Sequence, residues 1–166
     1  AMQIRSAETA GFCFGVERAV SLAEQTAKSC ASAVTLGPII HNHHVVERFE
    51  AMGLREIARA EDAQPGQTVV IRAHGIPVSE QQTLAARGAK LVDATCPFVK
   101  KIHVIARQAE EAGRHLLIIG TPTHPEVTAI ASYSSDAHVF QTAEALESWL
   151  TEAPGRRDLP FCMVSQ

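Results

Sequence analysis

The sequence predicts an α/β fold built on parallel sheets, and three observations support this class. Apolar runs typical of strands alternate along the chain with segments whose apolar residues recur at helical spacing. Glycine and proline separate most of these segments, as expected at turns. The run 116–119 is continuously apolar, which is typical of a strand buried on both faces of a parallel sheet.

The predicted strands are short apolar runs that end near glycine, proline or a polar cluster. Residues 3–7 form a weak first strand, and residues 33–36 form a second that ends at Gly37 and Pro38. The Pro65-Gly66 turn precedes the third strand. The complete set of predicted strands is 3–7, 33–36, 68–71, 90–92, 116–119 and 161–164.

The predicted helices rest on apolar periodicity and on their stop signals. Residues 16–28 carry apolar side chains three and four positions apart, which fits an amphipathic helix. Gly53, Gly88 and Gly113 each follow a later helical segment and provide its C-terminal stop. The complete set of predicted helices is 16–28, 44–52, 79–87, 98–112 and 142–150.

Composition excludes several classes of protein. The chain has 166 residues, 46% of them hydrophobic and 20% charged, so it can bury a core. A net charge of −3 gives no electrostatic case for binding nucleic acid. No apolar run approaches the roughly 20 residues that a membrane helix needs, and no signal peptide opens the chain. The expected location is therefore the cytoplasm. Because the sequence stops directly after an apolar strand, we also expect it to be truncated.

Soft ligands and imidazoles gather in the segments that follow the predicted strands. Each of these segments contains a cysteine or a histidine, and in chain order they read GFCFG, GPIIHN, RAHGIP, DATCP and GTPTHPEV. Functional groups of parallel α/β sheets lie at the carboxyl ends of the strands. The layout predicts two similar α/β lobes, residues 1–97 and 98–166, with a shared site at their strand ends.

Two of the four cysteines are candidate ligands or nucleophiles. Cys13 lies between glycines just before a helix, and Cys96 precedes Pro97, a residue favoured in the first helical turn. A helix N-terminus stabilises thiolate, the form that binds metal or attacks. Cys30 and Cys162 are expected to be small buried apolar residues. Zinc needs four ligands and an iron–sulfur cluster three or four thiolates, so two cysteines leave the site incomplete.

Three histidines and one glutamate follow strands. His41, His74 and His124 are expected to converge and bind an anion, and Glu126 beside them is a candidate general acid or base. An auxiliary role stays open for His43 and His44 because they are close to His41. The histidines interpreted as ordinary helix or loop residues are His43, His44, His103, His115 and His138.

The motifs GFCFGVERAV, GPIIHN followed by VVERFEAMG, AHGIP, DATCPFVKKIH and GTPTHPEV occur in this order. Together they resemble the N-terminal part of the 4-hydroxy-3-methylbut-2-enyl diphosphate reductase family, over almost the whole chain. The resemblance implies a trefoil of three α/β lobes around an iron–sulfur cluster. This chain would supply the first lobe and much of the second, with the third lobe absent and residues 1–12 a candidate partner for it.

The resemblance also implies roles for the candidate residues. Cys13 and Cys96 would be two of three cysteine ligands of a [4Fe–4S] cluster, the third lying outside this chain. The three strand-end histidines would bind the diphosphate, and Glu126 would deliver protons. The implied enzyme is an oxidoreductase of non-mevalonate isoprenoid biosynthesis that removes the allylic hydroxyl of its substrate with two electrons. Its implied partners are the allylic diphosphate and a ferredoxin- or flavodoxin-type donor, and the chain by itself is expected to be inactive.

Two alternatives from other functional classes stay open at this point. One is a non-catalytic α/β module whose histidines bind a phosphate or diphosphate. The other is a zinc-binding structural unit that uses Cys13, Cys96 and histidines. Iron content separates both alternatives from the reductase.

Overall fold

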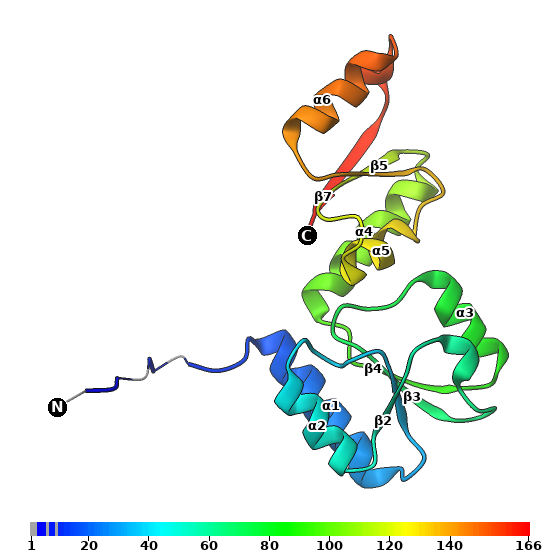
Figure 1. Cartoon of the computed structure of the whole chain (residues 1–166). Coiled ribbons are helices and arrows are strands. Elements are labelled where there is room, and N and C mark those ends of the chain that lie inside the picture. The colour runs from blue at the N-terminus through cyan, green and yellow to red at the C-terminus, as the bar shows by residue number, and fades with distance from the viewer. Residues whose placement is uncertain (1–2, 6, 9) are drawn as a thin grey trace.

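The computed structural model describes residues 3–5, 7–8 and 10–166. These residues form two small parallel sheets with helices on their faces (Figure 1). The strand order is β2-β1-β3-β4 in the first sheet and β6-β5-β7 in the second. We call each sheet with its helices a lobe, and the predicted α/β class with two small parallel sheets is confirmed.

The first lobe sandwiches its sheet between two layers. Side chains alternate across the central strand: Val70 faces the helices that carry Ala23 and Phe49, whereas Val69 and Ile71 face the opposite layer with Leu84. This burial on both faces explains why the strand is continuously apolar. The elements in chain order are α1 (Phe14–Ser29), β1 (Val34–Leu36), α2 (His43–Ala51), β2 (Arg55–Ile57), η1 (Ala60–Asp62), β3 (Thr68–Ile71), α3 (Val78–Ala86) and β4 (Lys90–Asp93).

The second lobe is smaller and follows the same plan. Leu116 and Ile118 of its central strand pack with Ala106 and other apolar residues of the preceding helix. Trp149 covers the opposite face, where its ring contacts aromatic side chains of the two outer strands. The elements are α4 (Pro97–Glu111), β5 (His115–Ile119), α5 (Pro125–Ala131), β6 (Ala137–Phe140), α6 (Ala143–Glu152), η2 (Arg156–Asp158) and β7 (Phe161–Ser165).

Most predicted elements are present with their ends shifted by one or two residues, and the exceptions have local causes. Residues 3–5 and 7 of the predicted first strand form no strand, and residue 6 lies outside the described residues. The sequence pattern did not predict β2, an exposed edge strand with polar residues, or β6. Helix α5 was not predicted either, because Pro125 begins it inside a segment rich in threonine and proline.

The lobes meet where α4 leaves the end of β4. Among the described residues, α4 packs against β5, β7 and α5 of the second sheet. The proposed boundary between residues 97 and 98 stays a prediction, as does the pairing of residues 1–12 with a third lobe. The N-terminal segment leads away from the first lobe (Figure 1), and Ile4 in it is 86% exposed.

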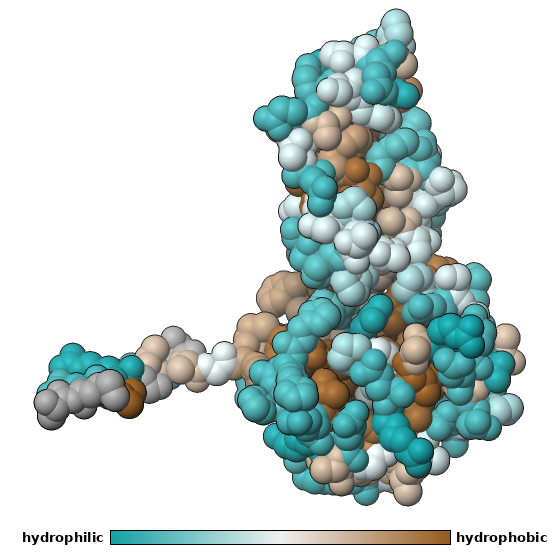
Figure 2. All heavy atoms as spheres, in the orientation of Figure 1, coloured by the Kyte–Doolittle hydropathy of each residue, from teal (hydrophilic) through white to brown (hydrophobic). Residues whose placement is uncertain are grey.

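Hydrophilic residues cover much of the face shown in Figure 2, and hydrophobic residues reach the surface in patches on both lobes. Within the described part of the chain, no helix combines the length and the apolar character needed to cross a membrane.

Candidate functional site

Three loops of the first lobe lie side by side at the carboxyl ends of its strands. The neighbouring strands β1, β3 and β4 lead into residues 37–42, 72–77 and 94–96. The backbone N–H of Ala73 donates to the carbonyl of Ile39 at 3.1 Å, and the N–H of Cys96 donates to the carbonyl of Ala73 at 2.9 Å. The ladder of the sheet therefore continues into the loops and fixes the distance between the side chains they carry.

The three strand-end histidines come together, and we call them the histidine trio. The ring centroids of His41 and His74 are 4.7 Å apart, and those of His74 and His124 are 5.6 Å apart. His41 and His74 belong to the first lobe, whereas His124 is the N-cap of α5 in the second. The expected convergence is thus present across both lobes, and the binding role of the trio stays a prediction.

The centre of the trio disfavours positive charge. Burial, together with the neighbouring His41, His124 and Arg72, lowers the pKa of His74 to about 4. The Nδ1 atom of His74 is buried and has no hydrogen-bond partner among the described residues. A buried polar atom without a partner is costly, so this site gains most from a ligand that is both polar and anionic.

Glu126 follows His124 in the first turn of α5. Its backbone N–H donates to Nδ1 of His124 at 3.2 Å, which leaves Nε2 as the atom that carries the proton of the neutral ring. Partial burial raises the pKa of the Glu126 carboxyl above its ordinary value, against a smaller opposing effect of His124. A raised pKa favours the protonated carboxyl, which is the form that a general acid needs.

The two candidate thiols sit at the N-caps of two helices that meet. Cys13 caps α1 and Cys96 caps α4, and neither side chain makes a capping hydrogen bond. Gly15 joins the pair, because a Cβ atom at this position would lie 2.4 Å from Sγ of Cys96. Only a glycine lets the first turn of α1 approach this sulfur so closely, and Cys13 is only two residues away.

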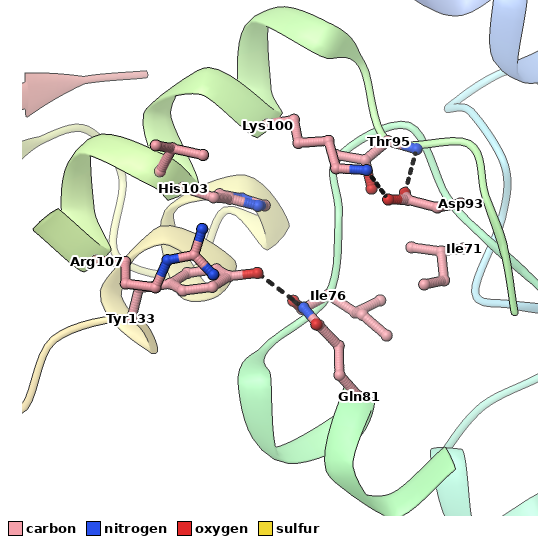
Figure 3. A pocket seen from close by; sticks show the side chains of 10 residues that line it. Ile71, Ile76, Gln81, Asp93, Thr95, Lys100, His103, Arg107 and Tyr133 are labelled. Atoms are coloured by element: carbon pink, nitrogen blue, oxygen red, sulfur yellow. Dashed lines mark hydrogen bonds and ion pairs between the residues drawn. The ribbon is translucent and has the colours of Figure 1, made fainter. Parts of the chain in front are cut away.

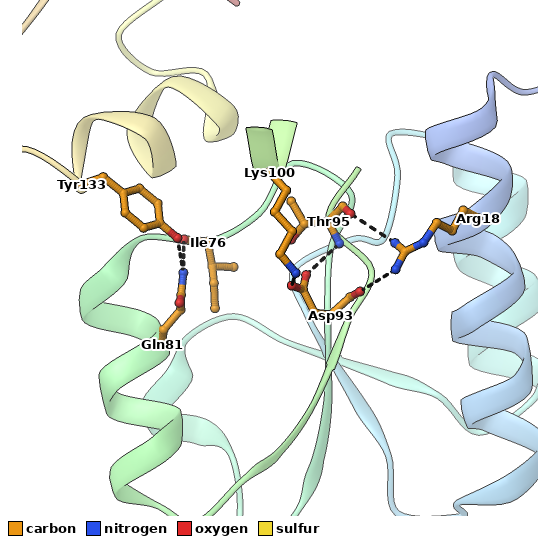
Figure 4. Close-up of polar contacts among 7 residues, drawn as sticks. All are labelled: Arg18, Ile76, Gln81, Asp93, Thr95, Lys100 and Tyr133. Atoms are coloured by element: carbon orange, nitrogen blue, oxygen red, sulfur yellow. Dashed lines mark hydrogen bonds and ion pairs between the residues drawn. The ribbon is translucent and has the colours of Figure 1, made fainter. Parts of the chain in front are cut away.

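Polar contacts hold the Cys96 loop in place (Figure 4). The guanidinium of Arg18 on α1 donates to the carbonyl oxygens of Thr95 and Asp93 at 3.2 and 3.4 Å. The Asp93 carboxylate accepts from the Thr95 N–H at 3.0 Å and pairs with Lys100. Burial alone would raise the pKa of Asp93, but the contacts with Lys100 and Thr95 lower it below the ordinary value. The loop is therefore positioned before any ligand binds.

Exposed aromatic rings surround the thiols. Phe14 and Phe98 flank the two cysteines in sequence and are 62% and 70% exposed. Phe12, on the other side of Cys13, lines a pocket of about 300 Å³ together with His41 and His74. This pocket therefore lies next to two members of the trio, and the residue before Cys13 forms part of its wall.

One buried histidine next to this site was predicted to be an ordinary helix residue. His103 of α4 is 6% exposed, stacks on Tyr133 at 4.8 Å, and has an Nε2 atom with no partner among the described residues. A Cβ atom at Gly75 would lie 2.6 Å from its ring. Burial lowers the pKa of His103 to about 4. The signal that could have found it is its spacing from Val99 and Ala106 on the buried face of α4.

His103 also lines a pocket of about 190 Å³ between the lobes (Figure 3). The side-chain amide of Gln81 donates to the Tyr133 hydroxyl at 2.8 Å across this pocket, and the N–H of Val78 donates to the Ser132 hydroxyl at 3.0 Å. These contacts join α3 of the first lobe to the end of α5 in the second. They keep His124 next to His74.

The remaining cysteines and the neighbouring histidines lie elsewhere. Cys30 is the C-cap of α1, and Cys162 lies in β7 of the second sheet; both are partly exposed rather than buried as predicted, although each packs against a core. His43 and His44 on α2 are exposed and pair with Glu47 of the same helix.

The thiols suit an iron–sulfur cluster in kind but not in number. Cys13 and Cys96 offer soft ligands at helix N-termini, and Gly15 lets the first turn of α1 approach the Cys96 sulfur. A cluster usually takes three or four thiolates. Cys30 caps the far end of α1, and Cys162 lies in the second sheet, so neither can complete the ligand set.

Comparison with known proteins identifies relatives along nearly the full sequence. The family model described as LytB protein matches residues 4–166. The 4-hydroxy-3-methylbut-2-enyl diphosphate reductase of Oleidesulfovibrio alaskensis is 47% identical over 89% of this chain and 53% of its own length. The enzyme of the same name from Nitratidesulfovibrio vulgaris is 41% identical over 99% of this chain and 58% of its own length.

Solved structures give the same result. A structure of (E)-4-hydroxy-3-methyl-but-2-enyl diphosphate reductase, described as the terminal enzyme of the non-mevalonate pathway, superimposes with a TM-score of 0.79 at 38% identity. The superposition covers 96% of this chain and 56% of the chain in that structure. The Plasmodium falciparum E-1-hydroxy-2-methyl-but-2-enyl-4-diphosphate reductase gives a TM-score of 0.81 at 25% identity, with 96% and 49% covered. The chain thus spans about half the length of the relatives it matches.

Proposed function

The chain belongs to the LytB protein family, and on this premise we propose that it provides part of the active site of a 4-hydroxy-3-methylbut-2-enyl diphosphate reductase. The reaction breaks the allylic C–O bond. The substrate takes up two electrons and two protons, the hydroxyl leaves as water, and isopentenyl and dimethylallyl diphosphates are the products. The steps assigned to this chain are diphosphate binding, proton delivery and ligation of the electron-transferring group.

The histidine trio binds the diphosphate. His74 has an unpartnered buried Nδ1 atom, and its protonation is disfavoured in the absence of an anion. A diphosphate next to the trio offers acceptors to the ring N–H groups and compensates the positive charge. Binding therefore raises the pKa of His74 and takes up a proton. The rings of His41 and His124, which lie next to His74, offer further nitrogen atoms to the same anion.

Glu126 delivers a proton to the reacting end of the substrate. Its carboxyl is half-buried, its pKa is raised by that burial, and it belongs to the same helix turn that presents His124 to the trio. A protonated carboxyl next to the diphosphate site can protonate the leaving hydroxyl, which then departs as water. The Glu126→Gln variant keeps the shape of the side chain but lacks the acidic proton of the carboxyl group.

Cys13 and Cys96 would provide two ligands of a [4Fe–4S] cluster, and ligands other than the cysteines of this chain would complete it. When bound, such a cluster supplies electrons and a Lewis-acidic iron. The contact between Gly15 and Cys96 and the polar contacts of the Cys96 loop hold the sulfur in position. A ferredoxin- or flavodoxin-type protein is the proposed electron donor, and the proposed location is the cytoplasm.

The observation that carries this proposal is the approach of three imidazoles from two lobes, with ring centroids 4.7 and 5.6 Å apart. The loop that carries His74 is hydrogen-bonded to the loop that carries Cys96. Titration of the chain with inorganic diphosphate, followed by NMR of the histidine rings, tests the binding. We expect His74→Gln to weaken binding by at least about tenfold, the loss of one charge-assisted hydrogen bond. His44→Gln, an exposed histidine of the neighbouring helix, is the matched control.

Iron and acid-labile sulfide after anaerobic reconstitution test the ligation. Cys13→Ser and Cys96→Ser should each lower the bound iron, whereas Cys30→Ser and Cys162→Ser should not. Two other outcomes would replace the proposal. Diphosphate binding that survives both serine variants, with no iron in any preparation, would indicate a non-catalytic anion-binding module. Stoichiometric zinc that depends on Cys13 and Cys96 would indicate a zinc-binding structural unit.

A further inference from the structure

A second group of histidines lies in the second lobe, far in sequence from the trio. His115 begins β5, and His138 lies at the start of β6. The register pairs Leu116 with Ala137 and Leu117 with His138, so the residue before Ala137, Asp136, is opposite His115. Residues opposite each other and residues two apart on one strand share a face of the sheet. His115, Asp136 and His138 therefore share one face; we call them the His–Asp–His cluster.

The side chains of the cluster converge on one point. Nδ1 of His115 pairs with one oxygen of the Asp136 carboxylate, and Nε2 of His138 pairs with the other at 2.7 Å. One ligand atom from each residue lies within 4.8 Å of the other two. A tetrahedral zinc ion with bonds of about 2.1 Å separates its ligand atoms by about 3.4 Å. The three atoms are thus already close to the separation that a bound ion requires, and small side-chain rotations would complete it.

The turn that carries Asp136 is held from outside the cluster. The Glu110 carboxylate on α4 accepts hydrogen bonds from the hydroxyls of Ser134 and Ser135 at 2.9 and 2.6 Å, and from the N–H of Ser135 at 3.0 Å. The N–H of Asp136 donates to the Ser134 hydroxyl at 3.2 Å, and its carbonyl accepts from Leu116. The carboxylate is thus positioned by its backbone, as a preorganised metal ligand requires.

Aromatic side chains form the wall next to the cluster. The rings of His138 and Trp149 are 4.6 Å apart, and the rings of His115 and Phe161 are 5.9 Å apart. Phe140 and Phe161 in turn pack against Trp149. The three ligand side chains are partly buried against this wall and partly open to solvent. An ion can therefore enter, and its protein ligands are shielded on one side.

We propose that His115, Asp136 and His138 bind a divalent transition-metal ion of the zinc, nickel or copper class. Two imidazoles with one carboxylate are ligands that suit these ions, and three protein ligands leave a position for water. A purely structural ion pair would need one histidine, whereas here two rings from different strands aim at both oxygens of a single carboxylate. The exposed His43 and His44 also share one carboxylate, Glu47, but all three belong to a single helix.

Trp149 provides a local readout because it is the only tryptophan of the chain. The test is a titration of the complete chain with Ni²⁺, followed by tryptophan fluorescence, and then with Zn²⁺ as a competitor. We expect saturable quenching with one Ni²⁺ per chain, reversed by Zn²⁺. Asp136→Asn keeps the side-chain shape and the ring contacts, and should weaken the apparent affinity by at least about tenfold, as should His115→Gln.

Matched variants separate this site from other metal-binding groups. His43→Gln with Glu47→Gln removes the exposed pair on α2, and Cys13→Ser with Cys96→Ser removes the thiols; neither should change the quenching. Circular dichroism and thermal melts confirm that each variant is folded. Quenching that is unchanged in both Asp136→Asn and His115→Gln, or that is lost with the α2 pair or the thiols, would overturn the proposal. Absence of any saturable quenching in the unmodified chain would do the same.

Discussion

The two lobes gather histidines in opposite ways. In the first lobe, His41 and His74 lie in loops at the carboxyl ends of the strands, and the described residues place no carboxylate in an ion pair with any ring of the trio. In the second lobe, His115 and His138 lie at the amino ends of strands and share the Asp136 carboxylate. Imidazoles without a carboxylate suit an anion, whereas imidazoles around a carboxylate suit a cation.

The largest expected effect is on diphosphate affinity, and it comes from placing a carboxylate in the histidine trio. His41→Asp places a carboxylate next to His74 and repels the incoming diphosphate; like charges in close contact cost several kcal/mol. We expect the affinity for inorganic diphosphate to fall by at least about 100-fold, measured by calorimetry at constant salt. His41→Gln, which removes the imidazole without adding a charge, should have a clearly smaller effect. Equal losses in the two variants would show that charge does not govern the site.

The next largest effect concerns how each site is assembled. The thiol pair of the first lobe depends on the close approach of α1 to the start of α4. Gly15→Ala should therefore force α1 away from Cys96. Overpacking of this kind costs about 1–3 kcal/mol in the free energy of unfolding, which urea denaturation measures. Removing the sulfur in the double variant Gly15→Ala with Cys96→Ala should restore most of the loss. A double variant no more stable than Gly15→Ala alone would mean that the sulfur is not the obstacle.

The buried histidines of the first site should make the fold sensitive to acid. Burial lowers the pKa of His74 and His103 to about 4 in the folded chain, whereas an unfolded histidine has a pKa of about 6.5. The unfolded state then binds more protons, so this stabilisation is complete above about pH 6.5 and is lost as the pH falls towards 4. Each histidine contributes up to about 1.4 kcal/mol per pH unit.

His103→Phe preserves the stacked ring on Tyr133 and removes the titration. Urea denaturation at pH 7, 6 and 5 should therefore give a shallower decline for this variant than for the unmodified chain. The exposed His44→Phe is the control and should leave the decline unchanged. Parallel curves for the unmodified chain and His103→Phe would contradict the assignment.

The smallest effect belongs to the exposed pair on α2. His43, His44 and Glu47 share a helix surface, and their rings and carboxylate are mostly open to solvent. Exposed pairs contribute little to stability, so Glu47→Gln should change the free energy of unfolding by less than about 0.5 kcal/mol. Thermal melts measure this. A larger change in the free energy of unfolding would mean that the exposed helical pair stabilises the fold as a partly buried pair on a sheet does.

Periodicity and the strand-end rule were sufficient to predict much of this molecule. Both central strands, β3 and β5, are buried on two faces and therefore carry continuous apolar runs. The proximity of His41 and His74 follows from the neighbouring strands β1 and β3, which end at one edge of the first sheet. His124 follows a strand of the second sheet, and its approach to the pair was also predicted without coordinates. What the pattern did not predict is β2 and β6, because edge strands bury little and their residues are mixed.

The missed strand had a consequence for the sites. Without β6 there is no register, so nothing in the sequence brings His138 and Asp136 to His115. The spacing of His103 from Val99 and Ala106 indicates a buried position on α4, but its contacts with Tyr133 and with the backbone at Gly75 depend on packing between the lobes. Side chains at strand ends were therefore predictable, whereas those that depend on pairing or on packing between lobes were not.

Helix α4 connects the two lobes. Its first residue follows the Cys96 thiol, and its body packs against the second sheet. Its length of 15 residues corresponds to about 22 Å at 1.5 Å per residue. The turn held by Glu110 lies at the C-terminal end of this helix, and the Cys96 thiol lies at its N-terminal end. One helix therefore fixes the separation between the His–Asp–His cluster and the thiols.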